Sequence, residues 1–305
     1  MTWLQSVIIA VVEGITEFLP ISSTAHIKFT KAILQMDPHE PFSNMFDIVI
    51  QFAAILAVIV LYWKKFFDFK HISFYIKLFI AVLPVLIFGV LFKKHIDHIL
   101  GNVTVIACIT LLGGVLLLFI DQFFKRPIIT SEENMTNSHA LKIGLFQILS
   151  VLFPGLSRSA ATIVGGLASK LDRKTAAEFS FFLAVPTMAA ATVKDIYDTY
   201  KETPEVFHSS NMSMLGVGCL VSFIISLFAI KTFLTYVQKH TFRAFGVYRI
   251  IAGIAILILI YTGVIKHEEK PAPAAPKTAL VSKPVLKLRN HDLINKDKIC
   301  IPSLY

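Results

Sequence analysis

The segment from Val11 to His26, VVEGITEFLPISSTAH, places acidic, hydroxyl and imidazole side chains within one otherwise apolar stretch. Glu13 and Glu17 are four residues apart, so that both side chains project from one face of a helix. Pro20 cannot continue that helix. Three hydroxyl residues that favour the start of a second helix come next: Ser22, Ser23 and Thr24. With His26 in the first turn of that helix, the segment predicts a helical break that carries acid, hydroxyl and imidazole chemistry together.

A second break is predicted in the other half of the chain, at residues 153–163, FPGLSRSAATI. Pro154 and Gly155 interrupt an apolar run, and Ser157, Arg158 and Ser159 open the next helix. Free N–H groups at the start of a helix attract anions, and the guanidinium of Arg158 offers a planar fork of donors that suits phosphate. One break therefore supplies negative groups and the other a positive one.

The elements that must position these residues are membrane helices. Hydrophobic residues make up 55% of the 305 residues and the mean hydropathy is +0.69, which indicates an all-α integral membrane protein. Six apolar runs have about the 20 residues that a helix needs to cross a bilayer: 44–62, 74–92, 103–123, 177–197, 213–236 and 244–265. Gly113 and Gly114 in the third run favour close helix packing.

The net charge of +9 comes with no aromatic and basic platform, so nucleic-acid binding is not expected. The three cysteines form neither a disulfide framework nor a metal cluster.

Each break joins two helices that are too short to cross a membrane, which predicts two re-entrant hairpins. A single kinked span is the alternative for the first. Hairpins in corresponding places suggest an inverted repeat with halves at about 1–123 and 139–265, within one membrane domain of residues 1–265. Gln51 is expected to form a hydrogen bond with the first hairpin inside the bundle. Residues 266–305 form a Pro-rich basic tail that we expect to be disordered.

The short-loop basic residues indicate which side of the bundle faces the cytoplasm. We place nine of them on that side: Lys64, Lys65, Lys70, Lys77, Lys125, Arg126, Lys239, Arg243 and Arg249. An even number of spans then puts both termini outside.

A site with carboxylates, hydroxyls, a histidine and an arginine between two helix starts fits an anionic phosphate substrate. Because carboxylates repel phosphate, we expect Glu13 and Glu17 to hold a divalent cation, magnesium or calcium, that bridges to phosphate oxygens. Arg158 would neutralise charge on the transferring phosphoryl group. The depth of the site in the membrane suggests a lipid phosphate as substrate.

The same residues resemble a known family. EGITEFLPISSTAH at 13–26 and PGLSRSAATI at 154–163, with FDIVIQFAAILAV at 46–58 and EFSFFLAVP at 178–186, are similar to undecaprenyl-diphosphate phosphatases, also called bacitracin-resistance proteins. The resemblance covers roughly residues 3–265. Ala25, before His26, stands where the family commonly has glycine. The same is true of Ala160, which follows Ser159.

The resemblance implies hydrolysis of undecaprenyl diphosphate, a polyprenyl diphosphate lipid, to undecaprenyl phosphate and inorganic phosphate. That reaction recycles the lipid carrier of peptidoglycan synthesis and confers bacitracin resistance. It further implies a bacterial inner-membrane protein whose site opens to the outer face and depends on a divalent cation. The family's functional residues map onto eight positions here: Glu13, Glu17, Ser22, Ser23, His26, Arg158, Ser157 and Ser159. Thr24 and Gln51 are further candidates for binding the substrate.

Several alternatives remain open from the sequence. The nucleophile is His26, one of the two serines, or water. The charged groups are a structural cluster instead if they only hold the hairpins together, and a lipid transporter or flippase has the same broken-helix architecture. The sequence also leaves open whether the chain acts alone or as a homodimer.

Overall fold

The computed structural model describes residues 1–265 except 39, 93–95, 97–98 and 208. The predicted disordered tail at 266–305 lies outside the described residues. The described part is almost entirely helical, and its only β-bridge joins Ile129 to Leu171. The helices follow one another in the order α1 (Trp3–Thr16), α2 (Ser23–Ile33), α3 (Pro41–Leu61), α4 (Trp63–Phe66), α5 (Ile72–Leu91), α7 (Val103–Phe123), η1 (Glu132–Asn134), α8 (Asn137–Leu152), α9 (Arg158–Ala168), α10 (Arg173–Glu202), η2 (Pro204–Phe207), α11 (Ser209–Lys239) and α12 (Arg243–Tyr261).

Six helices in the described part are long and apolar enough to cross a membrane: α3, α5, α7, α10, α11 and α12. They coincide with the six predicted runs, which confirms the prediction of an all-α protein with six spans. Many large apolar side chains on their outer faces are exposed, for example Leu116 and Ile251. Such exposure is expected where lipid covers a helix.

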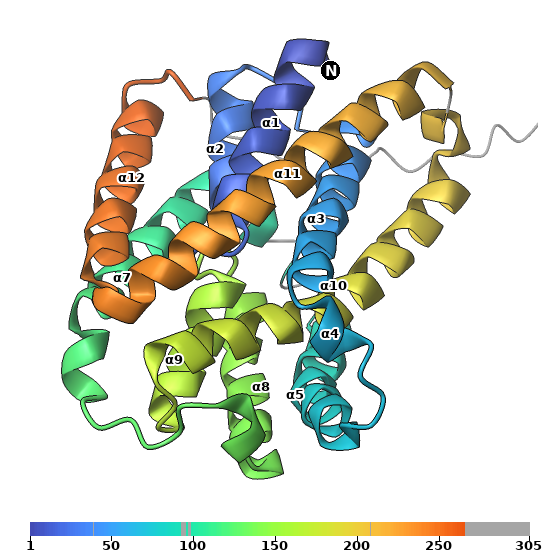
Figure 1. The fold of residues 1–305 in the computed structure, drawn as a ribbon. Coiled ribbons are helices and arrows are strands. Elements are labelled where there is room, and N and C mark those ends of the chain that lie inside the picture. The colour runs from blue at the N-terminus through green and yellow to red at the C-terminus, as the bar shows by residue number, and fades with distance from the viewer. Residues whose placement is uncertain (39, 93–95, 97–98, 208, 266–305) are drawn as a thin grey trace, which may run out of the picture. The chain divides into compact units, whose positions relative to one another are not determined.

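The shorter helices form two pairs, α1 with α2 and α8 with α9, each interrupted where the sequence places its breaks. Figure 1 shows that α1 begins at one end of the bundle and α8 at the other, so that the two pairs approach the middle from opposite ends. Their re-entrance into a membrane and the inverted sense of the repeat stay predictions.

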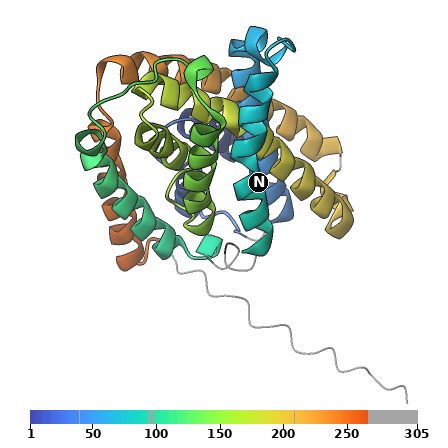
Figure 2. The ribbon, with the colours of Figure 1, turned by 90° about the horizontal axis from the view of Figure 1, so that it is seen from below.

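Some of the helix contacts recur when the two halves are exchanged. α1 packs on α11 as α8 packs on α5, and α3 contacts α11 as α10 contacts α5. Two further contacts join corresponding helices of the two halves, α7 to α12 and α3 to α10. Other contacts differ between the halves, since within the described residues α9 packs on α10 but α2 has no comparable contact with α3. Figure 2 shows α7 and α12 side by side at one edge of the bundle, apart from α5 and α8.

The contact between α7 and α12 depends on glycine, as the sequence predicts for Gly114. A side-chain carbon at Gly114 would lie 2.9 Å from the carbonyl oxygen of Gly246, and one at Gly246 would lie 2.8 Å from the carbonyl oxygen of Gly114. The two backbones therefore touch directly, which fixes where α12 lies beside the breaks.

Candidate active site

The two helical breaks have the same backbone geometry. Ser22 and Ser157 both have positive φ, 74° and 79°, a region that non-glycine residues seldom adopt. Each serine caps the helix after it, because its hydroxyl accepts a hydrogen bond from the backbone N–H of Ala25 or Ala160, at 3.3 and 3.2 Å. A positive-φ residue also ends each pair, Gln35 after α2 and Lys170 after α9, the same number of residues beyond its serine. The chain thus forms one local structure twice.

Glu17 lies at the point where the two breaks meet. Its Oε1 accepts a hydrogen bond from Nη2 of Arg158 at 2.7 Å, and its Oε2 accepts one from the hydroxyl of Ser23 at 2.6 Å. Nε2 of Gln51 on α3 is 3.4 Å from the same Oε2, which confirms the predicted contact of Gln51 with the first hairpin. Only 5% of Glu17 is exposed. One buried carboxylate therefore joins an arginine from the second half to a serine from the first.

Arg158 is the first residue of α9, directly after the serine cap. Its Nη1 donates to the backbone carbonyl of Ser180 on α10 at 3.0 Å, which holds the guanidinium plane. Its Nε is buried and has no hydrogen-bond partner among the described residues. An unused donor beside a helix start suits an anionic ligand.

The hydroxyl of Ser159 also links the two breaks, but it does not bind the carboxylate of Glu17. Ser159 donates to the backbone carbonyl of Phe18 at 2.8 Å, so α9 is attached to the end of the first hairpin. Thr162, one turn later, contacts the hydroxyl of Ser180 at 2.6 Å. Thr24 lies half-buried in the first turn of α2. Ser22, Ser157 and Ser159 thus have backbone partners, whereas Ser23 alone of the predicted serines donates to an acidic side chain.

Glu13 is fully buried, at 0% exposure, one turn before Glu17 on α1. Neither of its carboxylate oxygens has a hydrogen-bond partner in the described part of the chain. A buried carboxylate without partners is costly, and a bound cation would remove that cost. The two glutamates therefore fit a hard divalent cation. No group of three or more acidic, His or Cys side chains gathers among the described residues, so substrate oxygens or water would complete its coordination.

The ring of His26 has hydrogen-bond partners other than the carboxylate of Glu17. Its Nδ1 is 2.7 Å from the carbonyl oxygen of Ser22, and its Nε2 is 2.8 Å from the hydroxyl of Tyr248 on α12. Because a carbonyl only accepts, Nδ1 carries the proton, and the tyrosine donates to Nε2. The structure thus gives both ring nitrogens partners other than Glu17, Ser23 and Arg158.

Lys77 and Arg249, two of the nine basic residues counted for the short loops, lie inside helices and are buried. Lys77 is buried in α5, where its Nζ is 3.1 Å from Oε1 of Glu132. Arg249 is fully buried in α12, where its guanidinium donates to backbone carbonyls of both breaks. The sequence signal for a role of Arg249 is its position inside an apolar run. A buried arginine in a span is costly unless it has a structural or functional role.

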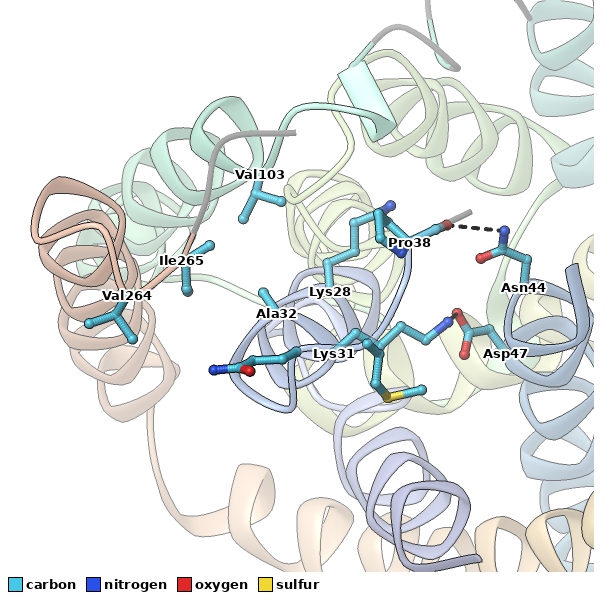
Figure 3. A pocket seen from close by; sticks show the side chains of 11 residues that line it. Lys28, Lys31, Ala32, Pro38, Asn44, Asp47, Val103, Val264 and Ile265 are labelled. Carbon is cyan, nitrogen blue, oxygen red and sulfur yellow. Dashed lines mark hydrogen bonds and ion pairs between the residues drawn. The ribbon is translucent and has the colours of Figure 1, made fainter. Parts of the chain in front are cut away.

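A cavity of about 450 Å³ opens at the far end of α2 (Figure 3). Lys31 on α2 crosses to α3 there, with its Nζ 2.5 Å from Oδ2 of Asp47 and 3.1 Å from the carbonyl oxygen of Ser43. None of the predicted site residues lines this cavity, whose wall includes Lys28 and Asn44. The Lys31–Asp47 ion pair fixes α2 against the helix that carries Gln51.

The fold and the site together define a polytopic membrane protein in which two broken helices from opposite ends of the bundle bring a carboxylate, a serine and an arginine into one buried centre. Comparison with known sequences identifies its family. The sequence profile of the family described as bacitracin resistance protein BacA matches residues 6–255. The chain belongs to this family, as its motifs predict.

Similar proteins in three bacteria share nearly the whole length. The chain is 48% identical over 260 residues to a protein of Flavobacterium johnsoniae named undecaprenyl-diphosphatase, covering 85% of this chain and 96% of that protein. A protein of the same name from Bdellovibrio bacteriovorus is 44% identical over 265 residues, 86% of this chain and 98% of its own length. The corresponding protein of Porphyromonas gingivalis is 44% identical over 280 residues, with coverage of 87% and 99%.

Proposed function

We propose that this protein hydrolyses undecaprenyl diphosphate to undecaprenyl phosphate and inorganic phosphate. The names of its relatives support the substrate. The observation that carries the chemistry is the position of Glu17, whose two carboxylate oxygens accept from Ser23 and from Arg158. In this role the protein recycles the lipid carrier of peptidoglycan synthesis and protects against bacitracin.

Ser23 is the nucleophile in this proposal. A serine hydroxyl that donates to a carboxylate at 2.6 Å has its general base already in place. Its oxygen attacks the terminal phosphorus while Glu17 takes the hydroxyl proton. The bond from phosphorus to the bridging oxygen breaks, Glu17 gives the proton to that oxygen, and undecaprenyl phosphate leaves. Glu17, again a carboxylate, then takes a proton from a water that attacks the phosphoserine. The bond from phosphorus to the Ser23 oxygen breaks, Glu17 returns the proton to that oxygen, and inorganic phosphate is released. His26 is not the nucleophile here, because its Nε2 accepts from Tyr248.

Arg158 holds the terminal phosphoryl group in this proposal. Its buried Nε is an available donor, and the N–H groups at the start of α9 face the same break. A planar fork beside a helix start matches phosphate oxygens and stabilises charge that develops during phosphoryl transfer. Ser157, Ser159 and Thr24 lie at the two helix starts beside these groups. Glu13 and Glu17 would hold magnesium or calcium, which supplies charge neutralisation for the diphosphate when bound.

The site faces outward in this proposal, in the bacterial inner membrane. The basic loops after α3 and α7 lie at the end of the bundle opposite the start of α3, which places that start on the outer side. A membrane-impermeant thiol reagent tests this in intact cells with a chain whose own cysteines are replaced by serine. We expect labelling of Asn44→Cys without permeabilisation and of Lys125→Cys only after it. The reverse pattern would contradict the orientation.

The activity is tested by phosphate release from undecaprenyl diphosphate by the purified protein in detergent. We expect release with magnesium or calcium, none with a chelator, and release about 1,000-fold less efficient from the Arg158→Ala variant. Undecaprenyl phosphate serves as a control substrate that lacks the anhydride. A folded protein that releases no phosphate but moves the lipid across liposome bilayers would instead be a lipid carrier.

A further inference from the structure

Arg249 joins the two breaks although no sequence motif singles it out. Its Nη1 donates both to the carbonyl oxygen of Pro20 at 3.1 Å and to that of Leu156 at 2.7 Å. One nitrogen of α12 therefore connects the residue two before Ser22 with the residue directly before Ser157. Its Nη2 donates to the carbonyl of Gly155 at 2.9 Å, which adds a second contact with the second break.

The side chain is held on its other side by α7. Its Nε donates to the carbonyl oxygen of Thr110 at 3.1 Å, and the hydroxyl of Thr110 in turn lies 3.3 Å from the carbonyl oxygen of Gly155. Gly113, one turn further along α7, leaves room for the guanidinium, since a side-chain carbon there would be 2.2 Å from Nη2. Arg249 is 0% exposed. Within the described part of the chain, all its acceptors are backbone carbonyls and no carboxylate pairs with it.

These bonds leave none of the three guanidinium nitrogens without an acceptor, so Arg249 is not a group that contacts substrate. Its bonds instead end within three residues of Ser23 and within two residues of Arg158. Pro20, Gly155 and Leu156 lie between helices, so their buried carbonyls have no intrahelical partners and must be satisfied in another way. A planar fork meets several fixed carbonyls at once, which a lysine ammonium does not do as rigidly.

We propose that Arg249 is a positioning residue that sets the distance between the two breaks and thereby places Arg158 opposite Ser23 and Glu17. This inference rests on the proposed hydrolysis, in which groups from both breaks act on one phosphoryl group. A misplacement of about 1 Å between reacting groups lowers a rate about 100-fold. Loss of the fork therefore lowers kcat far more than it changes KM.

The test compares phosphate release by Arg249→Lys and Arg249→Met with that by Arg243→Met, which removes an exposed arginine at the start of the same helix. Rates are normalised to folded protein, measured by size exclusion and thermal unfolding. We expect kcat to fall about 100-fold in Arg249→Lys, with KM within about threefold, and to be unchanged in Arg243→Met. If Arg249→Met does not fold, Arg249→Lys, which keeps the charge, carries the comparison. Wild-type kcat in folded Arg249→Lys would overturn the inference.

A second readout separates positioning from general stability. In the wild-type background we expect Arg158→Ala to lower kcat/KM about 1,000-fold, whereas in the Arg249→Lys background the same change should cost only about tenfold, because Arg158 is already misplaced. An equal loss in both backgrounds would show that Arg249 supports the fold alone. The proposed hydrolysis is judged separately, by whether wild type and Arg243→Met release phosphate at all.

Discussion

The first break, around Ser22, and the second break, around Ser157, share a backbone and differ in chemistry. Both serines have positive φ and cap the following helix through the same N–H three residues on. The residue after the cap is Ser23 in the first break and Arg158 in the second. The helix before the first break carries two glutamates, whereas the corresponding positions before the second are Ile148 and Leu152.

The backbone of this site therefore does not determine its chemistry, because the same backbone carries different side chains in the two breaks. The repeated backbone provides two helix starts, whose residues Ser23 and Arg158 both contact Glu17, and the free N–H groups of a helix start attract anions. Only the non-equivalent side chains turn that geometry into an asymmetric centre with a base on one side and a phosphate donor on the other. Substitutions can therefore test each half against its counterpart.

The largest effect is expected at Glu17. Glu17→Gln removes the carboxylate that accepts from Ser23 and pairs with Arg158, so kcat should fall about 1,000-fold while the protein stays folded. Its matched control is Leu152→Met at the corresponding position of the second break, which should keep wild-type turnover. Steady-state phosphate release measures both. Turnover of Glu17→Gln within tenfold of wild type would show that the acidic break is not where the base lies.

A smaller loss is expected at Arg158. Arg158→Lys keeps the charge but loses the fork that contacts Glu17 and the carbonyl of Ser180 at the same time. We expect kcat/KM to fall about 100-fold, because a point charge does not reproduce bidentate recognition of phosphate. Kinetics at saturating cation separate this loss from a change in metal affinity. An unchanged kcat/KM would mean that a positive charge at position 158 is sufficient and that the planar guanidinium is not needed.

Glu13 should act through the cation. Glu13→Gln halves the carboxylates of the pair and leaves an amide in the buried position, so the concentration of magnesium needed for half-maximal activity should rise about tenfold or more. Saturating magnesium should restore most of the turnover, unlike in Glu17→Gln. Titration of activity with magnesium and with calcium measures the shift. An unaltered dependence of activity on the cation concentration would show that Glu13 does not hold the cation.

The smallest effects are expected at the caps, and they should be equal. Ser22→Ala and Ser157→Ala each remove a helix cap, which costs about 1 kcal/mol of stability, while φ stays positive. Glycine at either position should cost only a few tenths of a kcal/mol, because it adopts positive φ without strain. Thermal unfolding in detergent compares the four variants. A large effect at one break and none at the other would show that the two backbones are not equivalent.

Much of this arrangement could be predicted from local sequence because its signals are local. Pro20 and the Pro154–Gly155 pair end helices wherever they lie, and the serines after them start new ones, so both breaks were predictable. The six spans follow from length and apolarity, and Gln51 follows from the cost of a polar side chain facing lipid.

The parts that local sequence did not predict depend on partners far away in the chain. Arg249 is satisfied by carbonyls from three separate segments, and a carbonyl has no sequence signature. The same holds for the carbonyl of Ser180 that orients Arg158. The contact of the His26 ring with Tyr248 was not predictable either, because the two residues lie 222 positions apart. The burial of Lys77 depends on its ion-pair partner Glu132, which belongs to a distant segment of the chain.

The most direct test of a single site built from two unlike breaks is a double-variant cycle on Glu17 and Arg158. Phosphate release from undecaprenyl diphosphate is measured for Glu17→Gln, Arg158→Lys and the combined variant. If the two groups act as one unit, kcat/KM of the combined variant lies within about tenfold of the slower single variant. If the losses multiply, Glu17 and Arg158 act independently, and the two breaks do not form one shared centre.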